Sequence, residues 1–183
     1  DRLIGSGKPL RWSPLFVYHG FRYVILHGLE QPPEPADISA VFVHQMVEEL
    51  SSFSCSDETI NRLYACGKMA TLSNLFYMPT DCPQREKLGW TNDAQASAEQ
   101  MLQNFAVAPL FLKWLQDILD AMTDEGALPG IVPSHGWGYE NVDGPVSSGI
   151  LFELPVQVYR ATGDDAAIRL AYPAMQKHLA YMA

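Results

Sequence analysis

The hydrophobic pattern of this chain changes from a strand type to a helix type near residue 54, and this change limits the folds open to it. After that point, apolar residues recur three and four positions apart through most of the chain. The clearest stripe consists of Phe111, Leu112, Leu115, Ile118, Leu119 and Met122. Such a stripe covers one face of a helix, and its side chains are buried only when that face packs against other helices. The pattern therefore predicts a mainly helical array.

Local signals place the first helix between residues 56 and 79. Ser56 is suited to cap its N-terminus, and Asp57 and Glu58 then fall in the first turn, where the helix dipole favours carboxylates. Pro79 ends the helical pattern.

Four further helices are predicted, over residues 94–105, 109–123, 151–162 and 164–182. Pro155 and Pro173 are each expected to start or kink a helix, because proline lacks the amide proton that a helix interior uses. Residues 128–149 are rich in glycine and proline and are predicted to form a long connection.

Residues 1–53 carry strand-type patterns instead. Leu15–Tyr18 and Phe21–Leu26 are rich in aromatic and β-branched residues, and residues 38–50 alternate roughly between apolar and polar. We therefore divide the chain into a β-rich segment, 1–53, and a helical part, 54–183.

Charge and cysteine content exclude several classes of function. The net charge of −9 argues against a nucleic-acid partner, and no apolar run approaches the length of a membrane span. The three cysteines and five histidines show no metal-ligand spacing, so we expect neither a metal nor another cofactor. No signal-peptide pattern opens the chain, and the cellular location stays undetermined. A start without methionine and an abrupt end lead us to expect a piece of a longer protein.

Residues 81–95 carry most of the functional information. The run reads Asp-Cys-Pro-Gln-Arg-Glu-Lys-Leu-Gly-Trp-Thr-Asn-Asp-Ala-Gln, and its proline and glycine indicate a loop. Carboxylates exchange protons and bind hydroxyls, and an indole ring stacks on a pyranose face, so the run suits a sugar-processing site. The candidate site residues are Asp81, Arg85, Glu86, Trp90 and Asp93. The alternative is a solvated acidic loop.

This run closely resembles the corresponding segment of bacterial α-L-rhamnosidases of glycoside hydrolase family 78. The resemblance extends to residues 18–23, 53–64 and 159–164, and so spans nearly the whole chain. It implies a partial (α/α)₆ toroid of about five helices at 54–183, preceded at 1–53 by the end of a β-sandwich domain. It also implies inverting hydrolysis of terminal α-L-rhamnosyl bonds in a rhamnose-containing glycoside or oligosaccharide.

The resemblance further implies roles for single residues. Glu86 matches the general acid, and Trp90 matches an aromatic wall of the sugar pocket. The residues that match hydroxyl-binding positions are Asp81, Arg85 and Asp93. Trp137, in the long connection, is a further candidate for substrate binding.

The residues by themselves leave other roles open. Asp93 stands where it can cap the next helix, and Asp81 can form a turn before Pro83. Arg85 can hold a carboxylate in place instead of a sugar hydroxyl. Glu86 can form a surface ion pair with Arg85 or Lys87.

The chain also departs from the family pattern. Asn92 stands where glycine is usual, and Ser147-Ser148-Gly149 stands where Trp-Gly-Asp is common. The family's general base is a glutamate in the later half of the toroid, and nothing in residues 54–183 matches it. We therefore expect this chain alone to be inactive, and to need the remainder of the toroid or a further chain. The alternatives are a non-catalytic carbohydrate-binding module and a helical-toroid glycosidase for another sugar.

Overall fold

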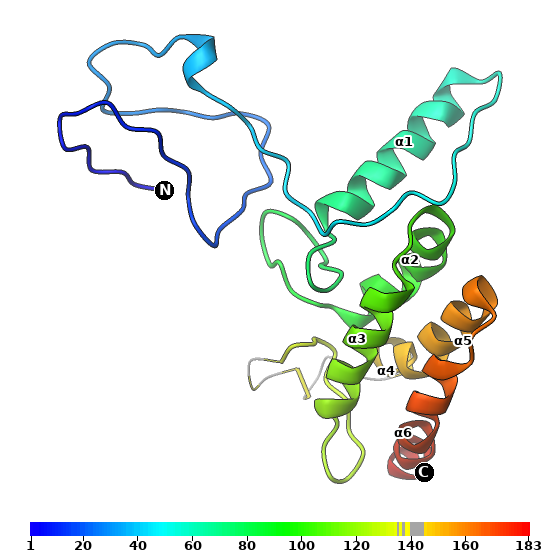
Figure 1. Cartoon of the computed structure of the whole chain (residues 1–183). Coiled ribbons are helices and arrows are strands. Elements are labelled where there is room, and N and C mark those ends of the chain that lie inside the picture. Colours follow the sequence, from blue (N-terminus) through cyan, green and yellow to red (C-terminus); the bar gives the residue numbers. More distant parts are fainter. Residues whose placement is uncertain (135, 137, 140–144) are drawn as a thin grey trace.

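The structure is mainly helical, as predicted. The computed structural model describes residues 1–134, 136, 138, 139 and 145–183. Within them the helices are η1 (Pro35–Asp37), α1 (Glu58–Ser73), α2 (Thr91–Asn104), α3 (Ala108–Asp120), α4 (Pro145–Ser148), α5 (Ile150–Thr162) and α6 (Ala166–Met182). Figure 1 shows α1 to α6 gathered in one body, from which the N-terminal segment with η1 projects.

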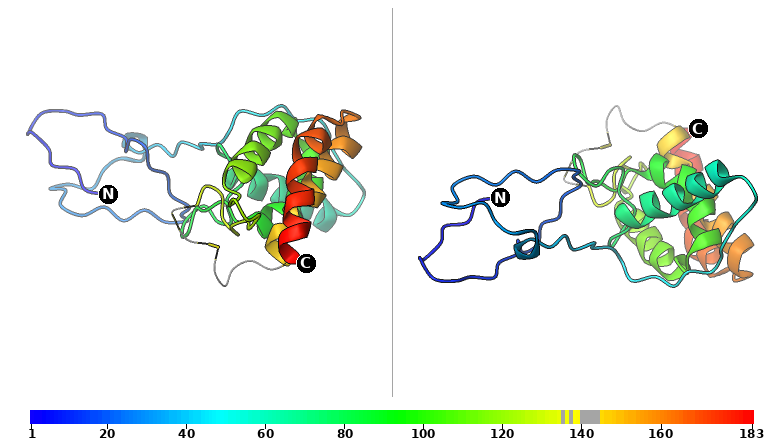
Figure 2. Two further views of the ribbon diagram at one scale, coloured as in Figure 1. Left: turned by 90° about the horizontal axis from the view of Figure 1, so that it is seen from below. Right: turned by 90° about the horizontal axis from the view of Figure 1, so that it is seen from above.

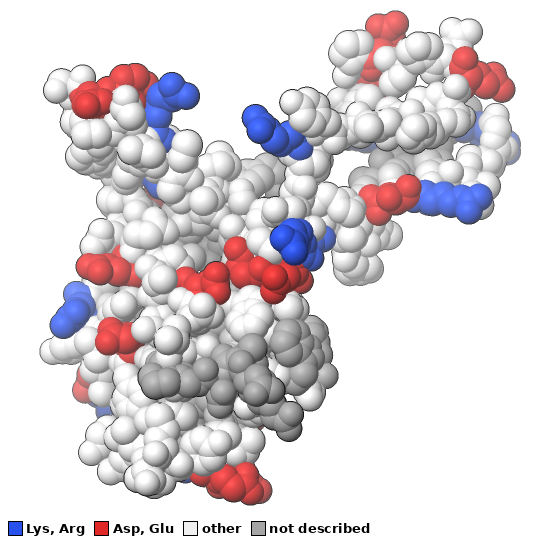
Figure 3. Space-filling view, turned by 180° about the vertical axis from the view of Figure 1, so that it is seen from behind, with Lys and Arg blue, Asp and Glu red and all other residues white. Residues whose placement is uncertain are grey.

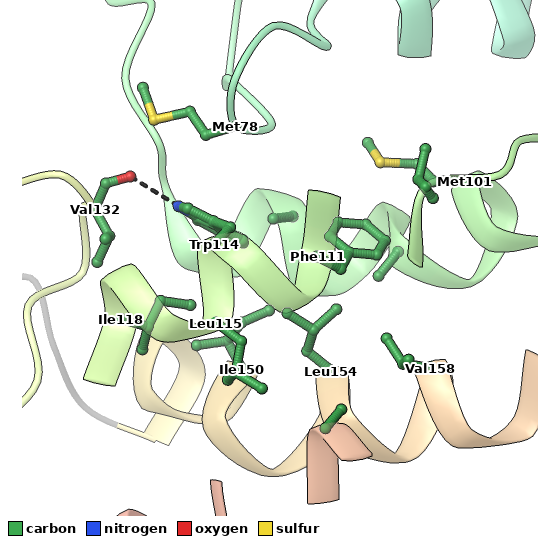
Figure 4. Packing of buried hydrophobic residues seen from close by; sticks show 14 of the residues in the cluster. Met78, Met101, Phe111, Trp114, Leu115, Ile118, Val132, Ile150, Leu154 and Val158 are labelled. Carbon is green, nitrogen blue, oxygen red and sulfur yellow. Dashed lines mark hydrogen bonds between the residues drawn. The ribbon is translucent and has the colours of Figure 1, made fainter. Parts of the chain in front are cut away.

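The core forms where α3 and α5 meet. Helix α5 packs against α2, α3 and α6, and α3 also contacts α6. Figure 4 shows apolar side chains of α3 facing those of α5. The largest fully buried side chains of these two helices are Phe111, Trp114, Leu115, Ile118, Ile150, Leu151 and Leu154. This contact gives the helical body one continuous apolar interior.

The apolar stripe of α3 is close to the predicted one. Phe111, Leu115 and Ile118 are buried. The other three members, Leu112, Leu119 and Met122, pack at the edge of the core. Trp114 was not predicted, although it is fully buried. Its indole Nε1 donates to the carbonyl oxygen of Val132 at 3.0 Å (Figure 4), so this polar atom enters the core with a partner.

Several details of the predicted helices are wrong. Helix α1 ends at Ser73 and not at Pro79, and α2 begins at Thr91 and not at Ala94. The N-cap of α1 is Asp57 and not Ser56, because the Asp57 carboxylate accepts from the amides of Thr59 at 2.8 Å and Ile60 at 3.4 Å. Residues 145–148 form the short α4 inside the predicted connection.

The predicted break between the last two helices is present. Gly163 ends α5 with a left-handed φ of 74°, a conformation that glycine adopts without a steric cost. Pro155 and Pro173 lie inside α5 and α6, so neither residue starts or ends its helix.

The strands predicted in residues 1–53 do not form. This segment is extended, and apart from η1 its only regular feature is an isolated bridge between Glu49 and Phe105. A β-ladder needs a neighbouring strand to accept its hydrogen bonds, and no such neighbour is present for Leu15–Tyr18 or Phe21–Leu26 among the described residues. Most side chains of the segment are consequently exposed.

The end of the N-terminal segment is attached to the helical body by backbone hydrogen bonds. The Gln45 amide donates to the Leu75 carbonyl at 2.7 Å, and the Leu50 amide donates to the Asn104 carbonyl at 2.8 Å. The Ala106 amide donates to the Glu48 carbonyl at 2.9 Å. Figure 2 shows the segment reaching the helices from one side.

Some helix faces stay open to solvent. In α1 the side chains of Ile60, Leu63 and Met69 are exposed, and in α6 those of Tyr172 and Leu179 are exposed. Within the described part of the chain, no helix combines the length and apolar character that crossing a bilayer requires.

We expect Trp114→Phe to destabilise the fold through Val132. Phenylalanine fills most of the same space but has no donor, so the Val132 carbonyl loses its partner inside the core. An unsatisfied buried group costs about 1–3 kcal/mol, and the urea midpoint should fall accordingly. Trp12→Phe, at an exposed tryptophan of the N-terminal segment, is the matched control and should leave the midpoint unchanged. Equal midpoints for the two variants would contradict this role of Trp114.

Candidate active site

The candidate site is built on a loop that joins α1 to α2. The Asp81 amide donates to the Leu88 carbonyl at 3.0 Å, and the Leu88 amide donates back to Asp81 Oδ1 at 2.9 Å. These two bonds close residues 81–88 into a compact loop. Inside it, the Glu86 amide contacts Cys82 Sγ at 3.1 Å. Asp81 thus has a structural role in addition to lining the site.

The C-terminal end of this loop pairs with residues 130–132. The Val132 amide donates to the Gly89 carbonyl at 2.9 Å, and the Thr91 amide donates to the Gly130 carbonyl at 2.9 Å. Trp90 and Ile131 form the antiparallel bridge between them. A Cβ atom at Gly89 would lie 2.0 Å from the Val132 carbonyl oxygen, so only glycine permits this approach.

The loop and the start of α2 surround an open hollow of about 330 Å³. Its lining residues are Asp81, Glu86, Trp90, Asn92, Asp93 and Ser147. Three of these six carry a carboxylate, so the hollow is acidic. Figure 3 shows acidic side chains gathered on this face of the molecule, toward the N-terminal segment. The structure therefore brings together four of the residues that the sequence predicted.

Glu86 is paired with the tryptophan of the same loop. The indole Nε1 of Trp90 donates to Glu86 Oε2 at 2.7 Å. This bond fixes the carboxylate beside the indole ring and leaves its other oxygen available to a ligand. Glu86 forms no ion pair with Arg85 or Lys87, which was the alternative interpretation of its sequence.

Asp93 lies in the first turn of α2 and is not its cap. The helix begins at Thr91, and the N-cap residue is Trp90, which makes no side-chain capping bond. The pKa of the Asp93 carboxyl is raised above its ordinary value, first by partial removal of water and then by the negative charge of Asp81, with Glu86 contributing least. The surroundings of Asp93 therefore favour its protonated form more than bulk water does.

Asn92 and Ser147 line the hollow, although the sequence indicated them only as departures from a family pattern. Asn92 Oδ1 is shielded from solvent and accepts no hydrogen bond within the described residues. Ser147 is buried in α4, and its carbonyl oxygen lies 2.9 Å from Thr91 Oγ1. The sequence did contain a signal that Asn92 lines the hollow, because Asn92 lies between the predicted site residues Trp90 and Asp93. No sequence signal indicated that Ser147 would reach the hollow.

Two predicted residues are not placed in the hollow. Arg85 is exposed and does not line it. Trp137 lies outside the described residues, as do His135, Glu140 and Asp143 of the same connection. In the described part of the chain, no three His, Cys, Asp or Glu side chains are arranged to hold a metal ion.

Comparison with known proteins assigns the chain to a family of glycoside hydrolases. Residues 48–183 match the bacterial alpha-L-rhamnosidase six-hairpin glycosidase domain. Residues 1–44 match the bacterial alpha-L-rhamnosidase concanavalin-like domain. Because the first match alone covers most of the chain, this protein belongs to the bacterial α-L-rhamnosidase family. The extended segment in front of the helices thus corresponds to a short stretch of the concanavalin-like domain.

Curated relatives named alpha-L-rhamnosidase come from several bacteria. One from Formosa agariphila is 34% identical over 183 residues, covering 94% of this chain and 19% of its own length. One from Streptomyces avermitilis is 30% identical over 181 residues, covering 98% of this chain and 17% of its own length. The chain therefore spans about a fifth of the length of these relatives.

Solved structures of α-L-rhamnosidases superpose on the chain. An α-L-rhamnosidase from Aspergillus terreus gives a TM-score of 0.83 at 30% identity, covering 91% of this chain and 20% of that one. The enzyme from Dictyoglumus thermophilum gives 0.72 at 34% identity, covering 76% and 16%. The Streptomyces avermitilis enzyme, solved with L-rhamnose, gives 0.67 at 26% identity, covering 75% and 13%.

Gly89→Ala should disrupt the loop and destabilise the fold. The added methyl meets the Val132 carbonyl, so the pairing of residues 89–91 with 130–132 must shift, at a cost of about 1–3 kcal/mol. Gly67→Ala is the control, because Gly67 lies inside α1 and nothing is within 4 Å of its added methyl. That change should stabilise the helix by roughly 0.5–1 kcal/mol. Urea unfolding measures both effects, and a neutral Gly89→Ala would contradict the close approach.

The raised pKa of Asp93 predicts a pH-dependent effect of Asp93→Asn. The folded chain binds this proton more tightly than the unfolded chain, so the carboxyl favours folding at low pH. That contribution is lost as the pH rises through the raised pKa. Relative to the parent, the melting temperature of the asparagine variant should therefore rise as the pH increases from roughly 3 to 7. Asp124→Asn, in an exposed turn, is the control; a constant difference across this range for Asp93→Asn would refute the expectation.

Proposed function

We propose that the hollow is the acid side of an α-L-rhamnosidase active site that hydrolyses terminal α-L-rhamnosyl bonds with inversion. The observation that carries this proposal is the placement of Glu86, whose carboxylate lies beside the indole of Trp90 in a hollow shared with Asp81 and Asp93. Membership of the α-L-rhamnosidase family supports the choice of sugar. The L-rhamnose bound to the Streptomyces avermitilis enzyme supports it as well.

In this proposal Glu86 is the general acid. With Oε2 held by the Trp90 indole, Oε1 is free to carry the proton that passes to the glycosidic oxygen as the bond to the aglycone breaks. The transition state resembles an oxocarbenium ion, so the neighbouring carboxylates Asp81 and Asp93 also favour its developing positive charge.

The remaining residues bind the sugar. Asp81 and Asp93 are proposed to accept hydrogen bonds from its hydroxyls, and Trp90 to cover an apolar face of the ring. Arg85 and Trp137 complete the proposed binding set on the strength of the family resemblance alone.

An inverting mechanism also needs a carboxylate that activates water on the opposite face of the sugar. By the family resemblance, we propose that this base belongs to a later part of the helical ring, beyond residues 54–183. It follows that this chain by itself is expected to bind rhamnosides without hydrolysing them.

A second candidate function is supported by Ser147. It lines the hollow where the family commonly has Trp-Gly-Asp, so one wall of the sugar site is changed. A module that binds carbohydrate without cleaving it would be compatible with this change, as would a glycosidase for another sugar.

Glu86→Gln separates these functions in the gene product that contains this chain. The amide keeps the size of the side chain but has no acidic proton to transfer, so kcat on an alkyl α-L-rhamnoside should fall about 10²–10⁴-fold. L-rhamnose affinity, measured by calorimetry, should change little. Glu125→Gln, at an exposed glutamate in a turn, is the control and should keep full activity.

Other results would redirect the proposal. A parent protein that binds L-rhamnose without turnover would favour the binding module. Turnover of a different aryl glycoside, with none of the rhamnoside, would favour a glycosidase for another sugar. Full activity of Glu86→Gln would remove Glu86 from the acid role.

A further inference from the structure

The loop that carries Glu86 is held on its outer side by the N-terminal segment. Lys87 Nζ donates to the carbonyl oxygen of Tyr18 at 2.6 Å. The same ammonium group lies 4.6 Å from the centre of the Tyr18 ring, within the range of a cation–π contact. A residue 69 positions earlier in the chain thus contacts the immediate neighbour of Glu86 by two interactions.

Tyr18 is itself packed against the connection that follows α1. Its ring stacks on Phe76 with the ring centres 4.0 Å apart and the planes inclined by 26°. Tyr18 is half-buried, unlike most residues around it in the extended segment. Lys87 therefore binds to a side chain and a carbonyl that have a defined position.

A second contact lies on the other side of Glu86. Gly20 packs against the loop so closely that a Cβ atom there would lie 3.0 Å from Gln84 Cβ and 3.2 Å from Pro83 Cγ. Residues 18–20 consequently touch the loop both before and after Glu86.

The backbone at Lys87 indicates that this arrangement is imposed on the loop. Its φ of 56° is left-handed, which is unfavourable for a residue with a Cβ atom and is uncommon for lysine. Such conformations persist where surrounding contacts hold them, and they occur often at functional sites. The contacts of Lys87 with Tyr18 are of the kind that can hold it.

We propose that residues 18–20 clamp the 81–88 loop and that Lys87 is a positioning residue for Glu86. This inference rests on the acid role proposed for Glu86. Tyr18 belongs to the stretch that matches the concanavalin-like domain, and Lys87 to the stretch that matches the glycosidase domain. The preceding domain therefore contributes to the geometry of the acid, although residues 18–20 do not line the hollow.

Lys87→Asn tests the clamp in the gene product that contains this chain. Asparagine tolerates a left-handed backbone but cannot reach Tyr18, so the variant removes the contact with little added strain. Tyr18→Ala removes the ring from the other side of the contact and provides a second variant if the first folds poorly. Lys113→Gln, at an exposed lysine of α3, is the control.

The measurement is the dependence of kcat on the leaving group. A misplaced acid slows the hydrolysis of an alkyl rhamnoside, whose leaving oxygen needs a proton, more than that of a 2,4-dinitrophenyl rhamnoside, whose leaving group does not. We expect Lys87→Asn and Tyr18→Ala to lower kcat about 10–100-fold on the alkyl substrate. The effect on the dinitrophenyl substrate should be a few-fold at most, with KM nearly unchanged and Lys113→Gln like the parent.

The outcomes separate this inference from the proposed function. Equal losses on both substrates, or no loss on either, would overturn the clamp. Glu86→Gln is assayed in parallel and should show the same dependence on the leaving group, only larger. If Glu86→Gln lacks that dependence, the acid role itself fails; if Glu86→Gln shows it and Lys87→Asn does not, only the clamp fails.

Discussion

The candidate site depends on two hydrogen bonds made by the amide and the carbonyl of Val132. Its amide donates to the carbonyl of Gly89, at the end of the acidic loop, and its carbonyl accepts from the indole of Trp114, inside the core. One residue thus connects the packing of α3 to the position of the loop. The connection requires glycine at position 89, because a side chain there would meet the Val132 carbonyl. The apolar core in this way holds the loop that forms the polar pocket. Functional loops are commonly positioned by a rigid scaffold.

The loop is supported on a second side by a segment with little regular structure. The extended chain around Tyr18 exposes most of its side chains, yet it contacts the loop on both sides of Glu86. The core anchors the end of the loop near Trp90, and the N-terminal segment holds its outer turn near Lys87. Under the proposed function, the acid is therefore oriented by parts of two domains. Small displacements of a catalytic group change rates strongly, so such double support has a physical purpose.

Helices were easier to predict than the segment in front of them. The apolar stripe of α3 is a local pattern, and packing against α5 buries its central members as expected. Trp114 was missed because a tryptophan in a helix reveals nothing about its hydrogen-bond partner, which is 18 residues away. Leu15–Tyr18 and Phe21–Leu26 have a strand-type composition, but a strand also needs a neighbour, and composition cannot supply one. Ser147 was missed for a related reason, since only the packing of α4 brings it to the hollow.

Local periodicity and one continuous motif were enough to identify the helical class, the family and the residues of the acidic loop. The sequence contains both of these signals in full. It placed Asp81, Glu86, Trp90 and Asp93 within thirteen positions, and the structure brings these four around one hollow. Which residues join these four, and what each one contacts, depends on how the chain packs. The bond between Trp90 and Glu86, the raised pKa of Asp93 and the contact of Lys87 with Tyr18 depend on distances and burial. Those quantities exist only after segments distant in the sequence have packed together.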